Sequence, residues 1–246
     1  MGNLNFKSVF AVIFAVHSLL FAIALGWCLL ASVQFGYGVW HDHTGIKEAI
    51  AKYAPQNHYK KGFEQTTKEQ RLAMFSQINL AIHNGGEGLE DIYYETATSG
   101  GPQRLLREPE VVHLQDVANL IDFFFYPLVY VLLAWPPLAM LAIKRGWVPK
   151  LKGQVLTLAG LIGVIGAALL IVGPERVFNQ LHIWVFPDDH QWFFYYQDSL
   201  MSTMMFAPHL FGWIGLAWTI LIVFIFTGTA VALNSYSAKL KSNRSD

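Results

Sequence analysis

Residues 156–172 read LTLAGLIGVIGAALLIV and carry no charged side chain. A transmembrane helix needs roughly 17 to 25 mostly apolar residues, and this run reaches that length. Three further stretches, about 9–33, 120–143 and 210–233, have the same character. A backbone in lipid must satisfy its own hydrogen bonds, so each stretch should be a helix. The sequence therefore predicts an all-α membrane protein with four transmembrane helices.

The composition agrees with a membrane protein. Of the 246 residues, 54% are hydrophobic and only 14% are charged, against about 25% charged in soluble domains. Positive and negative charges balance, which argues against nucleic acid as a partner. The one cysteine, Cys28, lies within the first span and can form no intramolecular disulfide. No small-residue cleavage site follows that span, so we expect a retained anchor rather than a signal peptide.

Basic residues flank the predicted spans unevenly. By the positive-inside rule, the short connection between the second and third spans and both chain ends should face the cytoplasm. The residues behind this orientation are Lys7, Lys144, Arg145, Lys150, Lys152, Lys239, Lys241 and Arg244. Two segments, about 34–119 and 173–208, should then form an extracytoplasmic cap on a single integral membrane domain, 1–246.

The first of these segments contains short predicted elements. Apolar residues recur at helical spacing in 44–54 and 66–82, which predicts two short helices. Glycines at 85–86 and at 100–101 mark turns, and residues 92–95 between them predict a short strand. The segment can form a small domain, but it is too short for a large core of its own.

Residues 107–117, REPEVVHLQDV, carry the first candidate for chemistry. Proline suits the first position of a helix and acidic residues suit its positive end, so a helix should begin near Glu108 and continue into the second span. Glu110, His113 and Asp116 follow each other at intervals of three and share one face of that helix. Either carboxylate could orient the imidazole, about 10 Å above the apolar part of the span.

Residues 178–186, FNQLHIWVF, carry the second candidate. Phe178, His182 and Phe186 recur at intervals of four, and aromatic rings crowd residues 192–196. An aromatic belt at the membrane surface accounts for most of these rings without any site. A lone histidine is more often structural than catalytic. Two histidines at matched depth beside one cap, however, form a candidate acid–base pair near neutral pH.

These two stretches resemble a known family, the lipoprotein intramolecular transacylases of bacteria, also called Lit. Residues 110–117 are similar to the family's E-x-x-H-M-x-D-V element, and residues 178–186 to its F-x-x-F-H-x-x-F-F element. Residues 192–201, WFFYYQDSLM, resemble its tryptophan and aspartate run. Leu114 and Leu181 depart from the family pattern, as does the segment 207–209.

The resemblance implies an acyl shift within diacylated lipoproteins in the bacterial cytoplasmic membrane. One ester-linked fatty acid would move from the diacylglycerol of the N-terminal cysteine to that cysteine's α-amine and leave a lyso form. The substrate then supplies its own nucleophile at high effective molarity, without a cofactor, a metal ion or an enzyme nucleophile. The implied partners are lipoprotein N-termini and membrane phospholipid, and the oligomeric state stays open.

The resemblance also carries catalytic roles over to His113 and His182. One imidazole would take a proton from the amine, and the other would stabilise the oxyanion or protonate the leaving glycerol oxygen. We expect His113, backed by a carboxylate, to be the base, and the reverse assignment stays open. The expected supporting residues are Asp116, Glu110, Trp192 and Asp198, and the candidate substrate-binding residues are Tyr93, Tyr94, Glu95 and Arg176. For Arg176, contact with lipid headgroups is the plainer explanation.

Two other functions fit the same sequence. In the first, histidines of the exported segments gather around zinc or copper, although their spacing has no compact motif. These are His41, His43, His58, His83 and His190. In the second, the cap binds a partner protein and the histidine elements are incidental. His17, inside the first span, should serve helix packing through a hydrogen bond to another helix.

Overall fold

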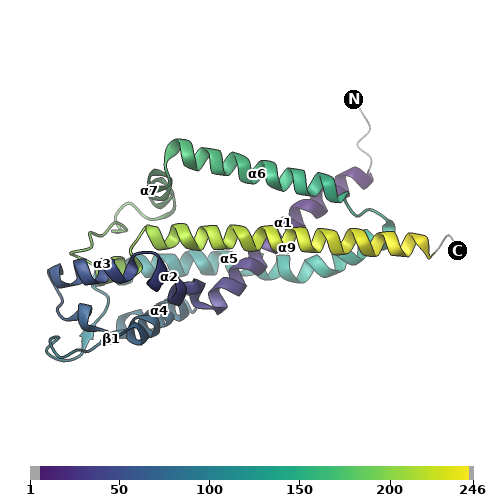
Figure 1. The fold of residues 1–246 in the computed structure, drawn as a ribbon. Helices are drawn as coiled ribbons and strands as arrows, with labels where there is room; N and C mark the ends of the chain where they lie inside the picture. Colours follow the sequence, from purple (N-terminus) through teal and green to yellow (C-terminus); the bar gives the residue numbers. More distant parts are fainter. Residues whose placement is uncertain (1–5, 244–246) are drawn as a thin grey trace. The chain divides into compact units, whose positions relative to one another are not determined.

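The computed structural model describes residues 6–243, so Arg244 lies outside the described residues. Within them, four helices are long and apolar enough to cross a membrane. They are α1 (Phe6–Ser32), α5 (Glu108–Arg145), α6 (Leu151–Val172) and α9 (His209–Ser242), drawn in Figure 1. The prediction of an all-α membrane protein with four spans is confirmed, and α5 begins at the predicted residue.

Contacts divide the chain into two compact units. We call residues 6–29, 126–171 and 216–243 the membrane unit, and residues 30–125 and 172–215 the cap unit. The cap unit thus combines the two segments that the sequence assigned to the exported side with the adjoining ends of the long helices.

The helices of the membrane unit are joined by apolar contacts and by side-chain hydrogen bonds to backbone. Phe14 of α1 packs on Ala139 and Ala142 of α5. The Trp218 indole N–H donates to Ile23 O at 3.0 Å, and His17 Nε2 lies 3.3 Å from Val131 O. The predicted bond from His17 to another helix is therefore present.

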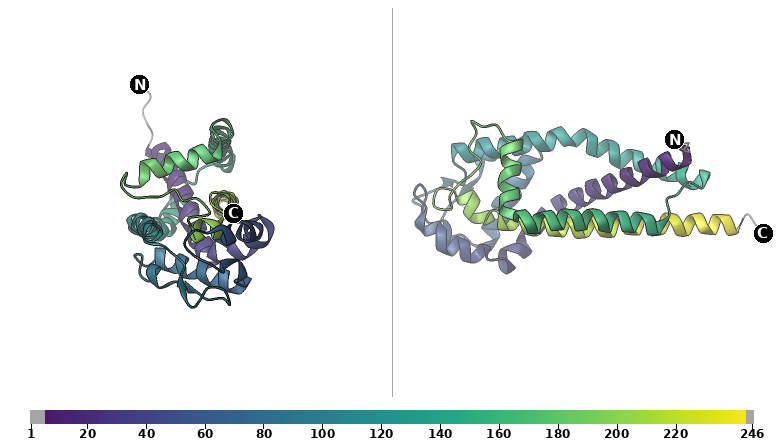
Figure 2. Two further views of the ribbon diagram at one scale, coloured as in Figure 1. Left: turned by 90° about the vertical axis from the view of Figure 1, so that its left-hand side faces the viewer. Right: turned by 90° about the horizontal axis from the view of Figure 1, so that it is seen from above.

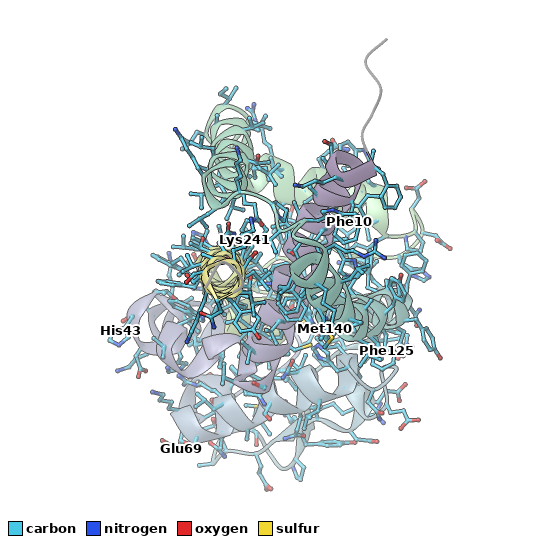
Figure 3. All side chains as sticks on the ribbon, turned by 90° about the vertical axis from the view of Figure 1, so that its right-hand side faces the viewer. Phe10, His43, Glu69, Phe125, Met140 and Lys241 are labelled. Atoms are coloured by element: carbon cyan, nitrogen blue, oxygen red, sulfur yellow. The ribbon has the colours of Figure 1, made fainter. Side chains whose placement is uncertain are left out.

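Both described ends of the chain belong to the membrane unit. Figures 1 and 2 show the start of α1 and the end of α9 at the same end of this unit, as expected for an even number of spans. Figure 3 looks along α9, whose last turn carries Lys239 and Lys241.

The cap unit contains the remaining regular elements of the described chain. Two of its helices, α3 (Ile46–Tyr53) and α4 (Lys68–Ile82), lie where helical spacing predicted them. The predicted strand is β1 (Tyr93–Tyr94), which pairs antiparallel with β2 (Gln103–Arg104). The other elements are α2 (Tyr37–His43), α7 (Pro174–Val185), α8 (Leu200–Met205), η1 (Gln34–Gly36), η2 (Ala54–Gln56), η3 (Phe63–Gln65) and η4 (Leu89–Asp91).

One hydrophobic core holds the cap unit together, and residues of both segments of this unit, 30–125 and 172–215, contribute to it. Tyr37 is 1% exposed and stacks on Phe75 with ring centroids 4.1 Å apart. Its hydroxyl donates to Met204 O at 2.9 Å, and Met204 and Leu210 are fully buried. Helix α8 therefore completes the core that the first segment begins. This packing holds α8, and with it the end of the chain that connects α7 to α8.

Candidate functional site

The site begins at the first turn of α5. Glu110 Oε2 accepts a hydrogen bond from Arg107 N at 2.7 Å, so its side chain reaches back to the residue before the helix and satisfies a free donor there. Its other oxygen accepts from Ser199 Oγ at 2.5 Å and from Met201 N at 3.3 Å. Glu110 is fully buried, and these donors compensate for the loss of water. Glu110 therefore links α5 to the start of α8, and these hydrogen bonds of its carboxylate go to residues other than His113.

Helix α7 presents the second histidine. Pro174 occupies its first turn after Gly173, whose positive φ of 93° favours glycine. His182 Nδ1 lies 2.7 Å from Phe178 O one turn earlier. A carbonyl only accepts, so Nδ1 carries the hydrogen and Nε2 keeps the lone pair in the neutral ring. Burial lowers the pKa of His182 below its ordinary value, and the bond to Phe178 O offsets part of this effect.

The structure brings the two imidazoles together. The ring centroids of His113 and His182 are 6.0 Å apart, with planes tilted by 33°. His113 is 8% exposed, and its Nδ1 has no hydrogen-bond partner among the described residues. A neutral imidazole nitrogen can donate or accept a hydrogen bond, so this atom is available to a substrate group.

Aromatic rings surround this pair. The Phe186 ring centroid lies 4.9 Å from that of His113 and 5.2 Å from that of His182. Trp192 lies 5.0 Å from His182 and Phe194 lies 6.1 Å from His113. The crowded aromatic residues therefore do more than form an interfacial belt, because part of them encloses the imidazoles in apolar surface.

Asp116 lies one turn after His113 on α5, but its carboxylate contacts a different imidazole. Its Oδ2 is 2.7 Å from Nδ1 of His190, in the connection between α7 and α8. This hydrogen bond raises the pKa of His190. The sequence predicted that Asp116 or Glu110 would back His113. In the described structure, the hydrogen bonds of both carboxylates go to other residues.

Asp198 lies near the C-terminal end of the same connection and contacts His58. Its Oδ1 lies 2.8 Å from Nδ1 of His58, and His58 N donates to Gln197 O at 2.9 Å. This contact and the one between Asp116 and His190 could not be predicted from the sequence, because the paired residues lie far apart in the chain.

The candidate substrate-binding residues lie in two places. Tyr93, Tyr94 and Glu95 line a pocket of about 230 Å³ between α4 and the hairpin, together with Gln70, Ala73, Met74, Gln77 and Pro102. Tyr94 itself is 4% exposed, and its hydroxyl donates to Lys61 O at 2.9 Å, so it also anchors the hairpin. Arg176 is exposed on α7.

The histidines of the metal hypothesis have separate surroundings. His41 contacts Asp42 and Arg71, whereas His83 Nδ1 lies 2.8 Å from Asn79 O. Within residues 6–243, no three His, Cys, Asp or Glu side chains are placed to hold a metal ion together. The metal hypothesis requires these histidines to lie together, and in the described chain they do not.

A protein-family model matches more than half of the chain. The model of the family described as lipoprotein intramolecular transacylase Lit matches residues 63–207. A protein of Aquifex aeolicus (strain VF5) is 27% identical over 190 residues, which cover 74% of this chain and 82% of the relative. The structure of the integral membrane transacylase Lit from Bacillus cereus matches with a TM-score of 0.65 and 14% identity, over 96% of this chain and 97% of that one.

A second structure of the Bacillus protein, with one histidine replaced by arginine, gives a TM-score of 0.64 at 15% identity, over 98% of this chain and 95% of that one. At these identities the structural matches establish a shared fold. The region matched by the family model contains both His113 and His182.

Proposed function

The chain belongs to the lipoprotein intramolecular transacylase family, and we propose that it moves an ester-linked fatty acid from the diacylglycerol of a lipoprotein's N-terminal cysteine to the α-amine of the same cysteine. The product is a lyso-form lipoprotein. The observation that carries this proposal is the pair of imidazoles 6.0 Å apart within the family-matched region.

In the proposed reaction, His182 is the base. Its Nδ1–H is held by Phe178 O, which leaves Nε2 as the proton acceptor. Its lowered pKa keeps this nitrogen unprotonated at neutral pH. The assignment reverses the one expected from the sequence, because the carboxylates that were to back His113 are bound to Ser199 and His190.

The proton and bond changes balance within the substrate and one imidazole. The α-ammonium group, with a pKa near ~8, first releases one proton to solvent. The neutral amine then attacks the ester carbonyl and gives its second proton to His182 Nε2. An amide C–N bond forms, the C–O bond to glycerol breaks, and His182 returns the proton to the glycerol oxygen. His113 donates a ring N–H to the oxyanion in the intermediate, a role supported by its unpartnered Nδ1.

The rest of the substrate has two candidate contacts. The apolar rings around the imidazoles suit the acyl chain next to the ester, whereas the mixed polar pocket beside the hairpin suits the polypeptide that follows the cysteine. We place both termini in the cytoplasm and the site at the extracytoplasmic face, on the basis of the basic residues at the helix ends.

The test uses purified protein reconstituted in lipid with a synthetic diacylated lipopeptide. Mass spectrometry should detect an unchanged total mass together with an acyl group on the α-amine. His113→Ala and His182→Ala should each lower the rate by about 10² to 10⁴-fold, as expected for loss of a general base or an oxyanion donor.

His43→Ala is the matched control, because His43 is an exposed histidine of α2 labelled in Figure 3. It should leave the rate within about twofold. An N-terminus that stays unmodified by folded wild-type protein would refute the proposal and favour the partner-binding alternative.

A further inference from the structure

The connection between α7 and α8, residues 186–199, has no helix or strand in the described structure, and we call it the lid segment. Three of the rings around the imidazoles, Phe186, Trp192 and Phe194, belong to it. The immediate surroundings of His113 and His182 therefore depend on a stretch of chain without the backbone bonds of regular structure.

Polar contacts hold the lid segment mainly at its C-terminal end. Gln197 and Asp198 are bonded to His58, and Ser199 is bonded to Glu110. Between residues 187 and 195, the contact of His190 with Asp116 is the one side-chain hydrogen bond to another element that the described chain contains. This contact is thus placed to control the part of the segment that carries Trp192 and Phe194.

The position of Asp116 makes the contact relevant to the reaction. Asp116 follows His113 by one turn of α5, and its side chain is only 12% exposed. Trp192, two residues after His190, places its ring on His182. Phe194, four residues after His190, places its ring near His113. A single hydrogen bond of 2.7 Å therefore links the helix that carries one imidazole to the ring that covers the other.

We propose that His190 and Asp116 are positioning residues that latch the lid segment over the two imidazoles. The inference rests on the proposed function, because the imidazoles are the groups that the latch would align. Releasing the latch should displace the enclosing rings and admit water, and a displacement of about 1 Å near reacting groups can lower a rate by about 10²-fold.

The first experiment measures kcat and KM for His190→Ala, Asp116→Ala and the double variant. Each single variant should lower kcat by about 10 to 100-fold, with KM unchanged within about twofold, because the acyl chains still partition into the same lipid. The double variant should be no slower than either single variant, since both remove one contact. The latch would be refuted if the kcat losses of the single variants multiplied in the double variant. It would also be refuted if His190→Ala kept a kcat near wild type.

Rescue separates positioning from general stability. In His190→Asn, the side-chain amide can donate from the place of Nδ1, so kcat should return to within about threefold of wild type. The matched control is His58→Ala, which breaks the other histidine–aspartate contact of the same segment at a side chain that is 66% exposed. It should change kcat by less than about twofold. Failure of His190→Asn to restore kcat would contradict the proposal.

Hydrogen exchange tests the latch without any turnover. In His190→Ala, the amides of residues 187–195 should exchange at least about tenfold faster, while those of α8 keep their wild-type rates. Faster exchange in a protein that transfers no acyl group would uphold the latch and reject the reaction. An active wild type whose lid exchange is unaltered by His190→Ala would reject the latch alone.

Discussion

Replacement of Glu110 tests whether the cap unit depends on this one buried carboxylate. In Glu110→Ala, the donors Arg107 N, Ser199 Oγ and Met201 N lose their acceptor. A buried donor left without a partner costs about 1–3 kcal/mol. Glu110 Oε2 also lies 3.5 Å from Arg107 Nε, and removing one partner of a buried ion pair costs about 3–5 kcal/mol in total. At about 2–4 °C per kcal/mol for a chain of this size, the melting temperature should fall by about 6–20 °C.

The assay is thermal unfolding of the detergent-solubilised protein, followed by tryptophan fluorescence. Glu110→Gln keeps one carbonyl acceptor for Ser199, so its loss should be about half as large. The control is Glu108→Ala, at an exposed position of the same helical turn, which should stay within about 0.5 kcal/mol of wild type. A fall of less than about 2 °C in Glu110→Ala would refute the idea that this network holds α5 to α8.

Three further predictions concern protonation and metals. Titration by ¹³C NMR, assigned with His182→Asn, should give His182 a pKa below the free value of about 6.5; a higher value would remove the proposed base at neutral pH. His190 has a raised pKa in the folded state, so its contact with Asp116 adds stability below about pH 6.5 that is lost as pH rises through the folded pKa. The stability lost in His190→Asn should therefore be larger at pH 5.5 than at pH 8.5, and equal losses would contradict the linkage. Because no proposed step uses a metal, dialysis against EDTA should leave the transfer rate unchanged, whereas a loss restored by Zn²⁺ would revive the metal hypothesis.

Much of the fold could be predicted because its signals are local. Apolar length predicts the spans, and Pro109 with its acidic neighbours predicts where α5 begins. Helical spacing likewise predicts α3 and α4, and glycine turns bracket β1. Each of these signals lies within the element that it describes, so no knowledge of tertiary packing is needed.

The partners of the carboxylates could not be predicted in the same way. Helical periodicity places Glu110, His113 and Asp116 on one face, and it suggests that they serve each other. In the structure, Glu110 meets Ser199 and Asp116 meets His190. These contacts depend on where the chain after α7 returns to α5, which no repeat in the sequence encodes. Tyr94 is similar, because only the folded hairpin reveals that its ring is buried.

The bond between His182 and Phe178 O has a consequence for how the base is made. Donor and acceptor belong to the same turn of α7, so folding of that short helix alone selects which ring nitrogen is free. A movement of α7 as a body would carry this choice with it unaltered. Changes elsewhere in the protein could then misplace the base or expose it, but they would not convert it to the other tautomer.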